Sequence, residues 1–302
     1  MKIIFSVFSV LIFSTALLAQ QVPDTNFTYK NDNPAYSKEK GPVIMVDNFH
    51  NNFHTIDDRY KPFAKLLEGD GYVLSSYSDY FSEEGLERCR ILVISNALDS
   101  STTESLPTPS AFKKTELTEI EKWVKSGGRL FLIADHMPFA GAASELAEAF
   151  GFEYKNCFAN DDREGKPQRF CREDGSLPGN IITNGRNDRE KVDTVIAFTG
   201  SAFKIPDGAE PILPLGEYYT LYMPTTAWEF NNNTPKESGK GYCQGAFMKY
   251  GKGKIVVFGE AAMFSAQLAG TGPNQRRAGF NNPRARQNIQ LLLNIIHWLD
   301  ED

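Results

Sequence analysis

Imidazole, carboxylate and carboxamide side chains follow three apolar segments of this 302-residue chain. Each apolar segment has the length and composition of a buried strand. The candidates for chemistry that follow the three segments are, in order, Asp47, His50, Asn52 and His54; Asp135 and His136; and Glu260. Imidazole and carboxylate together are ligands for a divalent metal such as zinc, and either group can act as a general acid or base.

Several uses of these residues are open from the sequence. A secreted hydrolase, which could be metal-dependent, would use catalytic groups from the set Asp135, His136 and Glu260. Its metal ligands would be His50, His54 and His136. A binding domain would instead contact a polar small molecule, with contacts from Asp47, His50, Asn52 and His54. The remaining interpretation is that these side chains are polar loop residues that bond to the backbone and to one another.

Residues 127–150 form the element that must position Asp135 and His136. The apolar run at residues 130–134 predicts a strand buried on both faces, and the helical spacing that follows Pro138 predicts a helix. Asp135 and His136 would then lie at the carboxyl end of a central strand. In open α/β sheets, ligands bind at that edge.

The rest of the chain repeats this alternation of strand and helix. Strands are predicted at residues 43–46, 72–75, 91–94, 130–134 and 254–258. Helices are predicted at residues 60–68, 115–126, 142–150 and 285–299. The alternation predicts an α/β fold with a mostly parallel, flavodoxin-like sheet and helices on both faces. We expect His297, which lies in the last helix, to have a structural role.

Two segments depart from the alternation. Residues 151–190 are polar and rich in Asn, Asp, Arg and Gly, which indicates an insertion. Several short strands between residues 192 and 250 indicate a more antiparallel C-terminal region. We therefore predict a flexible lead-in at residues 20–40, followed by a single domain at residues 41–302.

The first 19 residues have the pattern of a secretory signal peptide, with Lys2, an apolar core and small residues before Gln20. We expect export to the periplasm or the extracellular space, and no membrane span in the mature chain. A formal net charge of −6 argues against a nucleic-acid partner. Cys157 and Cys171 both fall in the polar insertion of an exported chain, so we expect them to form a disulfide.

Arginines flank the loop that follows Glu260. They are Arg276, Arg277, Arg284 and Arg286. Arginine clusters can hold carboxylate or phosphate groups. We interpret this cluster as part of a solvated loop, with an anion site as the alternative.

Three motifs carry a resemblance to a known superfamily. They are GGRLFLIADH, ITNGRNDREKVDTVIAFTGSAF, and GKGKIVVFGEAAMFSAQ followed by QNIQLLLNIIHWL. Their order resembles the class I glutamine amidotransferase-like superfamily, and within it the non-amidotransferase branches such as the trehalose-utilisation-type proteins and related exported domains of unknown function. The resemblance implies a flavodoxin-like sheet with a strand-to-helix elbow at residues 134–136, and it suggests a carbohydrate as the ligand.

The elbow departs from the amidotransferase pattern. In amidotransferases of this superfamily the elbow carries a nucleophilic cysteine, whereas this chain has Asp135 and His136 there. The glutamyl thioester of that reaction requires a thiolate. We therefore expect an exported amidotransferase-like domain without glutaminase activity, which binds a polar small molecule at the carboxyl edge of the sheet.

Overall fold

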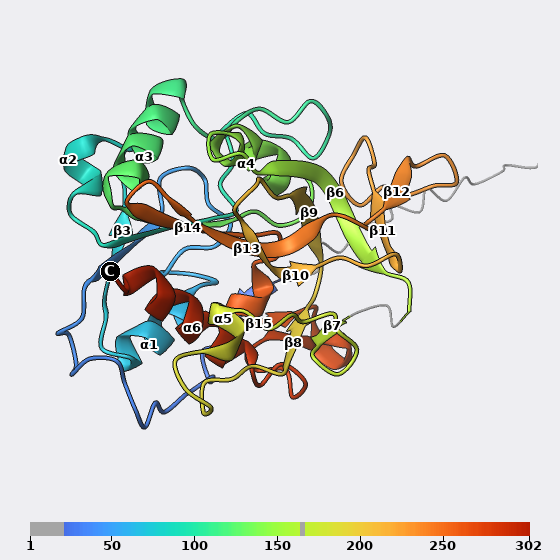
Figure 1. The fold of residues 1–302 in the computed structure, drawn as a ribbon. Coiled ribbons are helices and arrows are strands. Elements are labelled where there is room, and N and C mark those ends of the chain that lie inside the picture. The colour runs from blue at the N-terminus through green and yellow to red at the C-terminus, as the bar shows by residue number, and fades with distance from the viewer. Residues whose placement is uncertain (1–20, 164–166) are drawn as a thin grey trace, which may run out of the picture.

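A central mixed sheet organises the protein (Figure 1). The computed structural model describes residues 21–163 and 167–302, and the predicted signal peptide at residues 1–19 lies outside the described residues. One half of the sheet consists of parallel strands in the order β3 (Val73–Tyr77), β2 (Val43–Asp47), β4 (Ile91–Ser95), β5 (Arg129–Ile133) and β14 (Gly253–Phe258). Counted along the chain, this is the 2-1-3-4-5 order of a doubly wound sheet.

The other half of the sheet is antiparallel. It continues from β14 through β13 (Cys243–Tyr250), β9 (Gly200–Lys204), β6 (Glu153–Asp161), β11 (Tyr219–Tyr222) and β12 (Lys236–Ser238), and β10 (Glu210–Pro214) also pairs with β13. The expected parallel sheet and the expected antiparallel region are thus joined in one sheet. The segment expected to be an insertion supplies the long strand β6.

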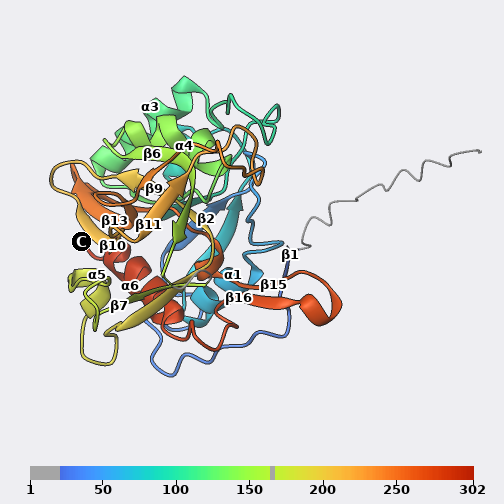
Figure 2. The same ribbon diagram turned by 90° about the vertical axis from the view of Figure 1, so that its right-hand side faces the viewer.

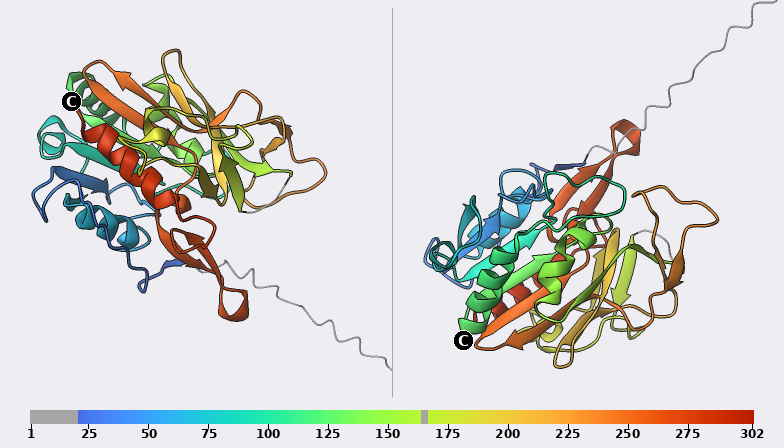
Figure 3. Two further views of the ribbon diagram at one scale, coloured as in Figure 1. Left: turned by 60° about the horizontal axis from the view of Figure 1, so that its bottom comes forward. Right: turned by 90° about the horizontal axis from the view of Figure 1, so that it is seen from above.

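Two small sheets flank the central one. The first pairs β7 (Gln168–Cys171) with β8 (Thr194–Ala197). The second has the order β1 (Gln21–Pro23), β15 (Ala266–Ala269) and β16 (Arg276–Gly279). Figure 3 shows the β15–β16 hairpin extending away from the body of the protein.

Helices cover both faces of the parallel half, as expected (Figures 1 and 2). One face carries α2 (Glu83–Leu86), α3 (Lys114–Ser126) and α4 (Phe139–Glu148). The other carries α1 (Lys61–Gly69), α5 (Ile181–Asn184) and α6 (Asn288–Asp300). Two short 3-10 turns, η1 (Ala262–Phe264) and η2 (Gly272–Asn274), lie near the β15–β16 hairpin.

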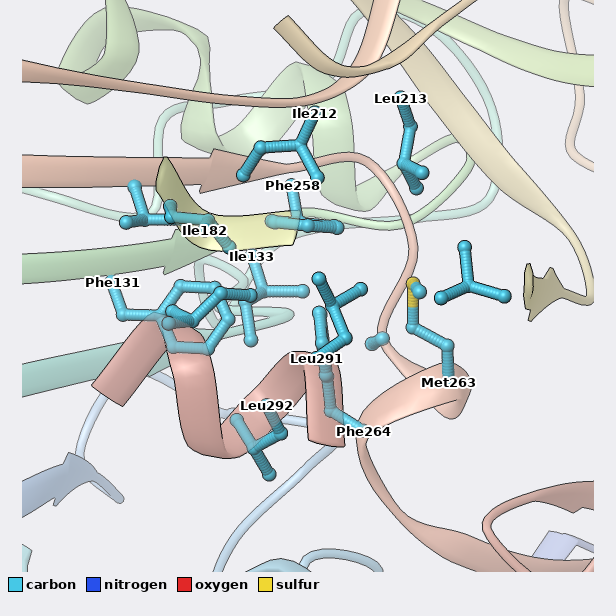
Figure 4. Close-up of a cluster of buried hydrophobic side chains, with 14 of the residues drawn as sticks. Phe131, Ile133, Ile182, Ile212, Leu213, Phe258, Met263, Phe264, Leu291 and Leu292 are labelled. Carbon is cyan, nitrogen blue, oxygen red and sulfur yellow. The ribbon is translucent and has the colours of Figure 1, made fainter. Parts of the chain in front are cut away.

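Alternation along the strands divides the core between these two faces. In β5, Leu130 and Leu132 belong to the cluster under α3 and α4, whereas Phe131 and Ile133 belong to the cluster under α6. All four side chains are fully buried. Figure 4 shows Phe131 and Ile133 with Phe258, Phe264 and other apolar side chains packed between the sheet and α6. Burial on both faces explains why β5 reads as a continuous apolar run in the sequence.

Buried cations from the sheet bind the end of the last helix. The Lys254 ammonium group donates to the carbonyl oxygens of Trp298, at 2.7 Å, and Glu301, at 2.6 Å. The Arg129 guanidinium donates from Nε to the carbonyl oxygen of Leu299, at 2.8 Å. The last carbonyls of a helix have no partner within the helix and carry partial negative charge, so cations are favoured there.

Hydrogen bonds also fix the N-terminal segment and His297. The N–H of Ala35 donates to Asp70 Oδ1 at 2.8 Å, and the Tyr36 hydroxyl donates to Asp300 Oδ2 at 2.5 Å. His297 is buried, with Nε2 2.6 Å from Asp70 Oδ2. Residues 21–40 therefore lie against the body of the domain, through contacts with both α1 and α6.

The expected disulfide between Cys157 and Cys171 is wrong. All four cysteines of the chain are free and buried. Cys157 lies on β6 of the central sheet, whereas Cys171 lies on β7 of a separate two-stranded sheet. The sequence shows that both fall in one polar segment, but it does not show that this segment forms strands in different sheets.

In residues 21–163 and 167–302, no helix is both long enough and apolar enough to cross a bilayer.

The core of the parallel half generates a stability prediction. Replacing the fully buried Ile133 with alanine leaves a cavity next to Phe131 and Phe258, so Ile133→Ala should lower the free energy of unfolding by about 2–5 kcal/mol. The matched control is Ile181→Ala, because Ile181 is 54% exposed and its truncation should cost about 0.5 kcal/mol or less. Urea unfolding of both variants measures the difference. Equal losses would contradict this placement of the core.

Candidate functional site

Asp135 occupies the elbow between β5 and α4. The backbone N–H of Asp135 donates to Asn96 Oδ1 at 2.9 Å, and Asp135 Oδ1 accepts the N–H of His136 at 2.9 Å. The side chain is buried. Burial raises the pKa of the Asp135 carboxyl, against the opposing effects of His136 and of the hydrogen-bond donors around it. The expected strand-to-helix elbow is therefore present, and its acidic residue is turned into the protein.

Glu260, which follows β14, is fully buried beside Asp135. Its two carboxyl oxygens accept the backbone N–H groups of Ala262, at 3.0 Å, and Met263, at 2.9 Å. Burial and the negative charge of Asp135 raise the pKa of Glu260 well above its usual range. A carboxyl group with a raised pKa is typical of a general acid. In this geometry, however, Glu260 binds the first N–H groups of η1 and has no exposed surface.

His50 lies between two carboxylates. Its Nδ1 is 3.0 Å from both carboxylate oxygens of Asp47, and its Nε2 is 3.0 Å from Glu116 Oε1. The ring stacks on Phe81, with centroids 4.8 Å apart. Burial opposes protonation, but the hydrogen bonds to Asp47 and Glu116 outweigh it and raise the pKa of His50 to about 9. His50 is therefore a buried imidazolium that joins the end of β2 to the start of α3.

Asn52 and Glu116 complete this first cluster. Asn52 Nδ2 donates to Asp47 Oδ2 at 3.0 Å and to the carbonyl oxygen of Ser95 at 3.2 Å. Glu116 Oε2 accepts the N–H of Lys113, the N-cap residue of α3, at 3.0 Å. The capping carboxylate therefore comes from Glu116, at the third position of the helix. Asp47 and Asn52 are occupied by these internal bonds.

His54 forms a second buried cluster with Asn96 and Gln267. Its Nδ1 is 3.1 Å from Asn96 Nδ2, and its Nε2 is 2.9 Å from Gln267 Nε2. Because Asn96 Oδ1 already accepts from Asp135, the Asn96 amide donates and Nδ1 of His54 accepts. Burial, with the charges of Arg59 and His136, lowers the pKa of His54 to about 3. His54 is therefore neutral at physiological pH.

His136 differs from the other histidines because its side chain is partly exposed. Nδ1 donates to the carbonyl oxygen of Met137 at 2.7 Å, which makes Nε2 an acceptor in the neutral ring. The ring stacks on Phe158, with centroids 4.7 Å apart and planes 11° from parallel. Trp228 meets the same ring edge-on, at 4.7 Å between centroids. Phe230 extends this aromatic group, 5.1 Å from Phe158.

A shallow groove lies near this aromatic group. Its volume is about 650 Å³, and it is lined by Leu106, Pro107, Thr108, Ser110, Gly141, Ser144, Glu145 and Asn156. The N–H of Leu106 donates to the carbonyl oxygen of Thr225 at 2.9 Å, which ties the groove-lining loop to the segment that carries Trp228. The other wall includes Gly141, Ser144 and Glu145 of α4, the helix that follows the elbow.

The predicted site residues all follow parallel neighbours of the sheet, so they lie at one edge. They do not form one open cleft. Asp47, His50 and Asn52 form one buried cluster, while His54, Asp135 and Glu260 lie in a second, and His136 faces the aromatic group. The proposed catalytic and binding roles of these residues stay predictions.

The geometry gives no support for a metal at these residues. In residues 21–163 and 167–302, no group of three or more His, Cys, Asp or Glu side chains is arranged to hold a metal ion. Both ring nitrogens of His50 face carboxylates, and both ring nitrogens of His54 face carboxamides. A ligand histidine needs a lone pair directed at the metal. These residues therefore do not fit a bound zinc ion.

Four residues that contact the predicted site residues are not among the candidates identified from the sequence: Asn96, Glu116, Phe158 and Trp228. Asn96 directly follows the apolar strand at residues 91–95, as Asp47 and Asp135 follow theirs, so the same signal could have found it. Glu116 could have been found as an acid near a helix start. No local signal distinguishes Phe158 or Trp228 from core aromatics, because their position beside His136 depends on the pairing of β6 and β11.

Comparison with known proteins supports the fold. The mmIFT52 N-terminal domain matches with a TM-score of 0.61 and 15% identity, over 86% of this chain and 98% of that one. A ThuA-like protein from Bacteroides uniformis ATCC 8492 matches with a TM-score of 0.46 and 13% identity, over 90% and 94%. Another, from Parabacteroides merdae ATCC 43184, gives a TM-score of 0.43 and 12% identity, over 86% and 90%. No family model and no curated protein sequence matches this chain.

The charged His50 predicts a pH dependence of stability. Its folded pKa is about 9 against 6.5 for the unfolded chain, so its contribution is fully present below pH 6.5 and is lost as the pH rises through 9. The contribution is on the order of 3 kcal/mol. Between pH 6 and pH 10, wild-type protein should lose about this much more unfolding free energy than His50→Gln. Parallel pH profiles for the two proteins in urea unfolding would show that His50 is neutral when folded.

Proposed function

We propose that this chain is an exported, flavodoxin-like domain of the amidotransferase-like type, that it binds a carbohydrate at the carboxyl edge of its sheet, and that it has no glutaminase activity. The observation that carries the proposal is the half-exposed aromatic group around His136. His136 follows β5, at the sheet edge where open α/β proteins bind ligands, and this supports the proposal.

Trp228 is the main support for a ligand. Its side chain is 51% exposed, and its backbone has φ of +68°. A bulky residue with a left-handed backbone is strained, and such strain tends to persist at functional sites. Phe230, two residues later, is 47% exposed. Two large aromatic rings left in contact with water beside a histidine form a surface suited to a partner that is apolar on one face and polar at its edge.

A sugar ring fits this description. Its C–H groups can lie on an aromatic face while its hydroxyl groups exchange hydrogen bonds with nearby polar side chains. The adjacent groove supplies such groups in Thr108, Ser110, Ser144 and Asn156. Its volume of about 650 Å³ lies within the range of small-molecule sites. The motif resemblance to trehalose-utilisation-type proteins agrees with this ligand class.

Binding is favoured over hydrolysis by the state of the acidic residues. Glu260 is fully buried with both oxygens bonded to backbone N–H groups, and Asp135 is buried beside it. A general acid or base must come within hydrogen-bond reach of the substrate. Of the proposed catalytic residues, His136 is the one with a partly exposed side chain.

The state of the thiols supports the part of the proposal that concerns glutaminase activity. Residues 134–136 at the elbow are Ala, Asp and His, and all four cysteines are buried. Burial raises the pKa of the Cys89, Cys157 and Cys243 thiols to about 12. Such thiols are poor nucleophiles at neutral pH.

Carbohydrate binding is tested with Trp228→Ala. Calorimetric titration with trehalose, maltose and cellobiose should detect binding of at least one sugar by the wild type. Trp228→Ala should weaken that binding about tenfold or more, since an aromatic contact contributes on the order of 1.5 kcal/mol beyond its buried area. The control is Tyr80→Ala, which removes an aromatic residue of similar exposure, 46%, from the loop after β3. Equal binding by wild type and Trp228→Ala would refute the assignment of the site.

Glutaminase activity is tested by measuring ammonia release from glutamine. We expect no release above the rate without protein, with or without prior alkylation of accessible thiols. Turnover that alkylation abolishes would mean that one of the buried cysteines becomes a nucleophile, contrary to the geometry described.

A further inference from the structure

A second groove lies between the N-terminal segment and the β15–β16 hairpin. Its volume is about 550 Å³. It is lined by Asp24, Asn26, Phe27, Thr28, Leu268, Gln275, Arg276, Arg277 and Asn281. No residue that lines the first groove lines this one. Its walls come from residues 24–28 and from residues 268–281, which the pairing of β1 with β15 brings together.

The groove has an excess of positive charge in an acidic protein. Arg276 and Arg277 are exposed, and among residues 21–163 and 167–302 neither forms an ion pair. Asp24 is the one acidic residue in the lining. Its carboxylate already accepts from Asn281 Nδ2, at 2.9 Å, and from the N–H of Asn26, at 3.1 Å. The guanidinium groups therefore outnumber the carboxylate, although the chain as a whole has a net charge of −6.

The groove lining also contains apolar, carboxamide and hydroxyl groups, which could contact the uncharged part of a ligand. Arg277 lies opposite Leu268, which in turn lies opposite Val22, so the three share one face of the small sheet. Phe27 packs on Phe280, with ring centroids 5.7 Å apart, and forms part of the wall. Carboxamide and hydroxyl groups of the groove can bond to polar substituents. This combination of planar cations, apolar surface and neutral donors suits a small organic anion.

We infer that this groove binds the oxyanion group of a small polar ligand, a carboxylate or a phosphate, through the guanidinium group of Arg277. Arg276, which lies opposite Ala269 and so points to the other face of the small sheet, adds positive charge at the groove. Guanidinium matches the planar geometry of carboxylate and binds phosphate with paired hydrogen bonds. The inference concerns a site separate from the aromatic group, and it does not require the proposed carbohydrate site to be correct.

The test uses the full chain and three probes: galacturonate, galactose and inorganic phosphate. Galacturonate differs from galactose by its carboxylate, and phosphate carries an oxyanion without a sugar. The site variant is Arg276→Gln/Arg277→Gln. The matched control is Lys249→Gln/Arg286→Gln, which removes the same charge from exposed positions outside the groove. Thermal unfolding checks that each variant folds.

We expect wild type and control to bind galacturonate or phosphate at least tenfold more tightly than galactose. The site variant should lose that preference, and Arg276→Lys/Arg277→Lys should weaken it because lysine cannot form the paired bonds. Trp228→Ala should leave anion binding unchanged, which separates this site from the proposed carbohydrate site. The inference is overturned if neither anion binds the wild type in preference to galactose, or if the control loses the preference as fully as the site variant.

Discussion

The carboxamide of Asn96 is the interaction on which the carboxyl edge of the sheet depends. One end of this group accepts the N–H of Asp135 and the other donates to His54, so a single side chain fixes both the elbow and the loop after β2. Asn96 has φ of +50°, a conformation that asparagine tolerates better than most residues. Its own N–H and carbonyl bond to Ile133 and Phe53. The backbone bonds could be made by other residues, but the two side-chain bonds require a side chain with both a donor and an acceptor, which leucine or an ionised aspartate could not supply.

The two buried histidines near that residue have pKa values shifted in opposite directions. His50 has a carboxylate at each nitrogen and is stable as a cation, whereas His54 has carboxamides at its nitrogens and is stable when neutral. Their effects on stability have opposite signs, because one favours the protonated ring and the other the unprotonated ring. Sequence alone gives both residues the same status, as histidines in one loop four residues apart. Only the partners contributed by α3, β4 and β15 distinguish them.

Much of the fold could be predicted because local patterns of apolar residues indicate its strands and helices. Each parallel strand is a short apolar run, and each helix between them has a stripe of buried residues, so the alternation was visible along the chain. The antiparallel half of the sheet was harder to predict from the sequence. Its strand β6 is polar enough to resemble an insertion, and it pairs with strands that are distant in the sequence. The error about Cys157 and Cys171 has the same origin. For the candidate site, the sheet edge was predictable from the order of strands, whereas the partition of its residues into separate clusters was not, because it depends on Glu116, Asn96 and Gln267 from distant elements.

The contacts at the end of α6 have a consequence for fraying of this helix. Lys254 and Arg129 lie on adjacent central strands and donate to carbonyl groups at the end of α6. Arg129 also donates to the carbonyl oxygens of Gly127 and Lys252, whereas the Lys254 ammonium donates to Trp298 and Glu301. Opening of the last turn of α6 would therefore leave a buried ammonium group without these acceptors, at a cost of several kcal/mol. Helix ends commonly fray at little cost, but local opening at this helix end is coupled to the centre of the sheet.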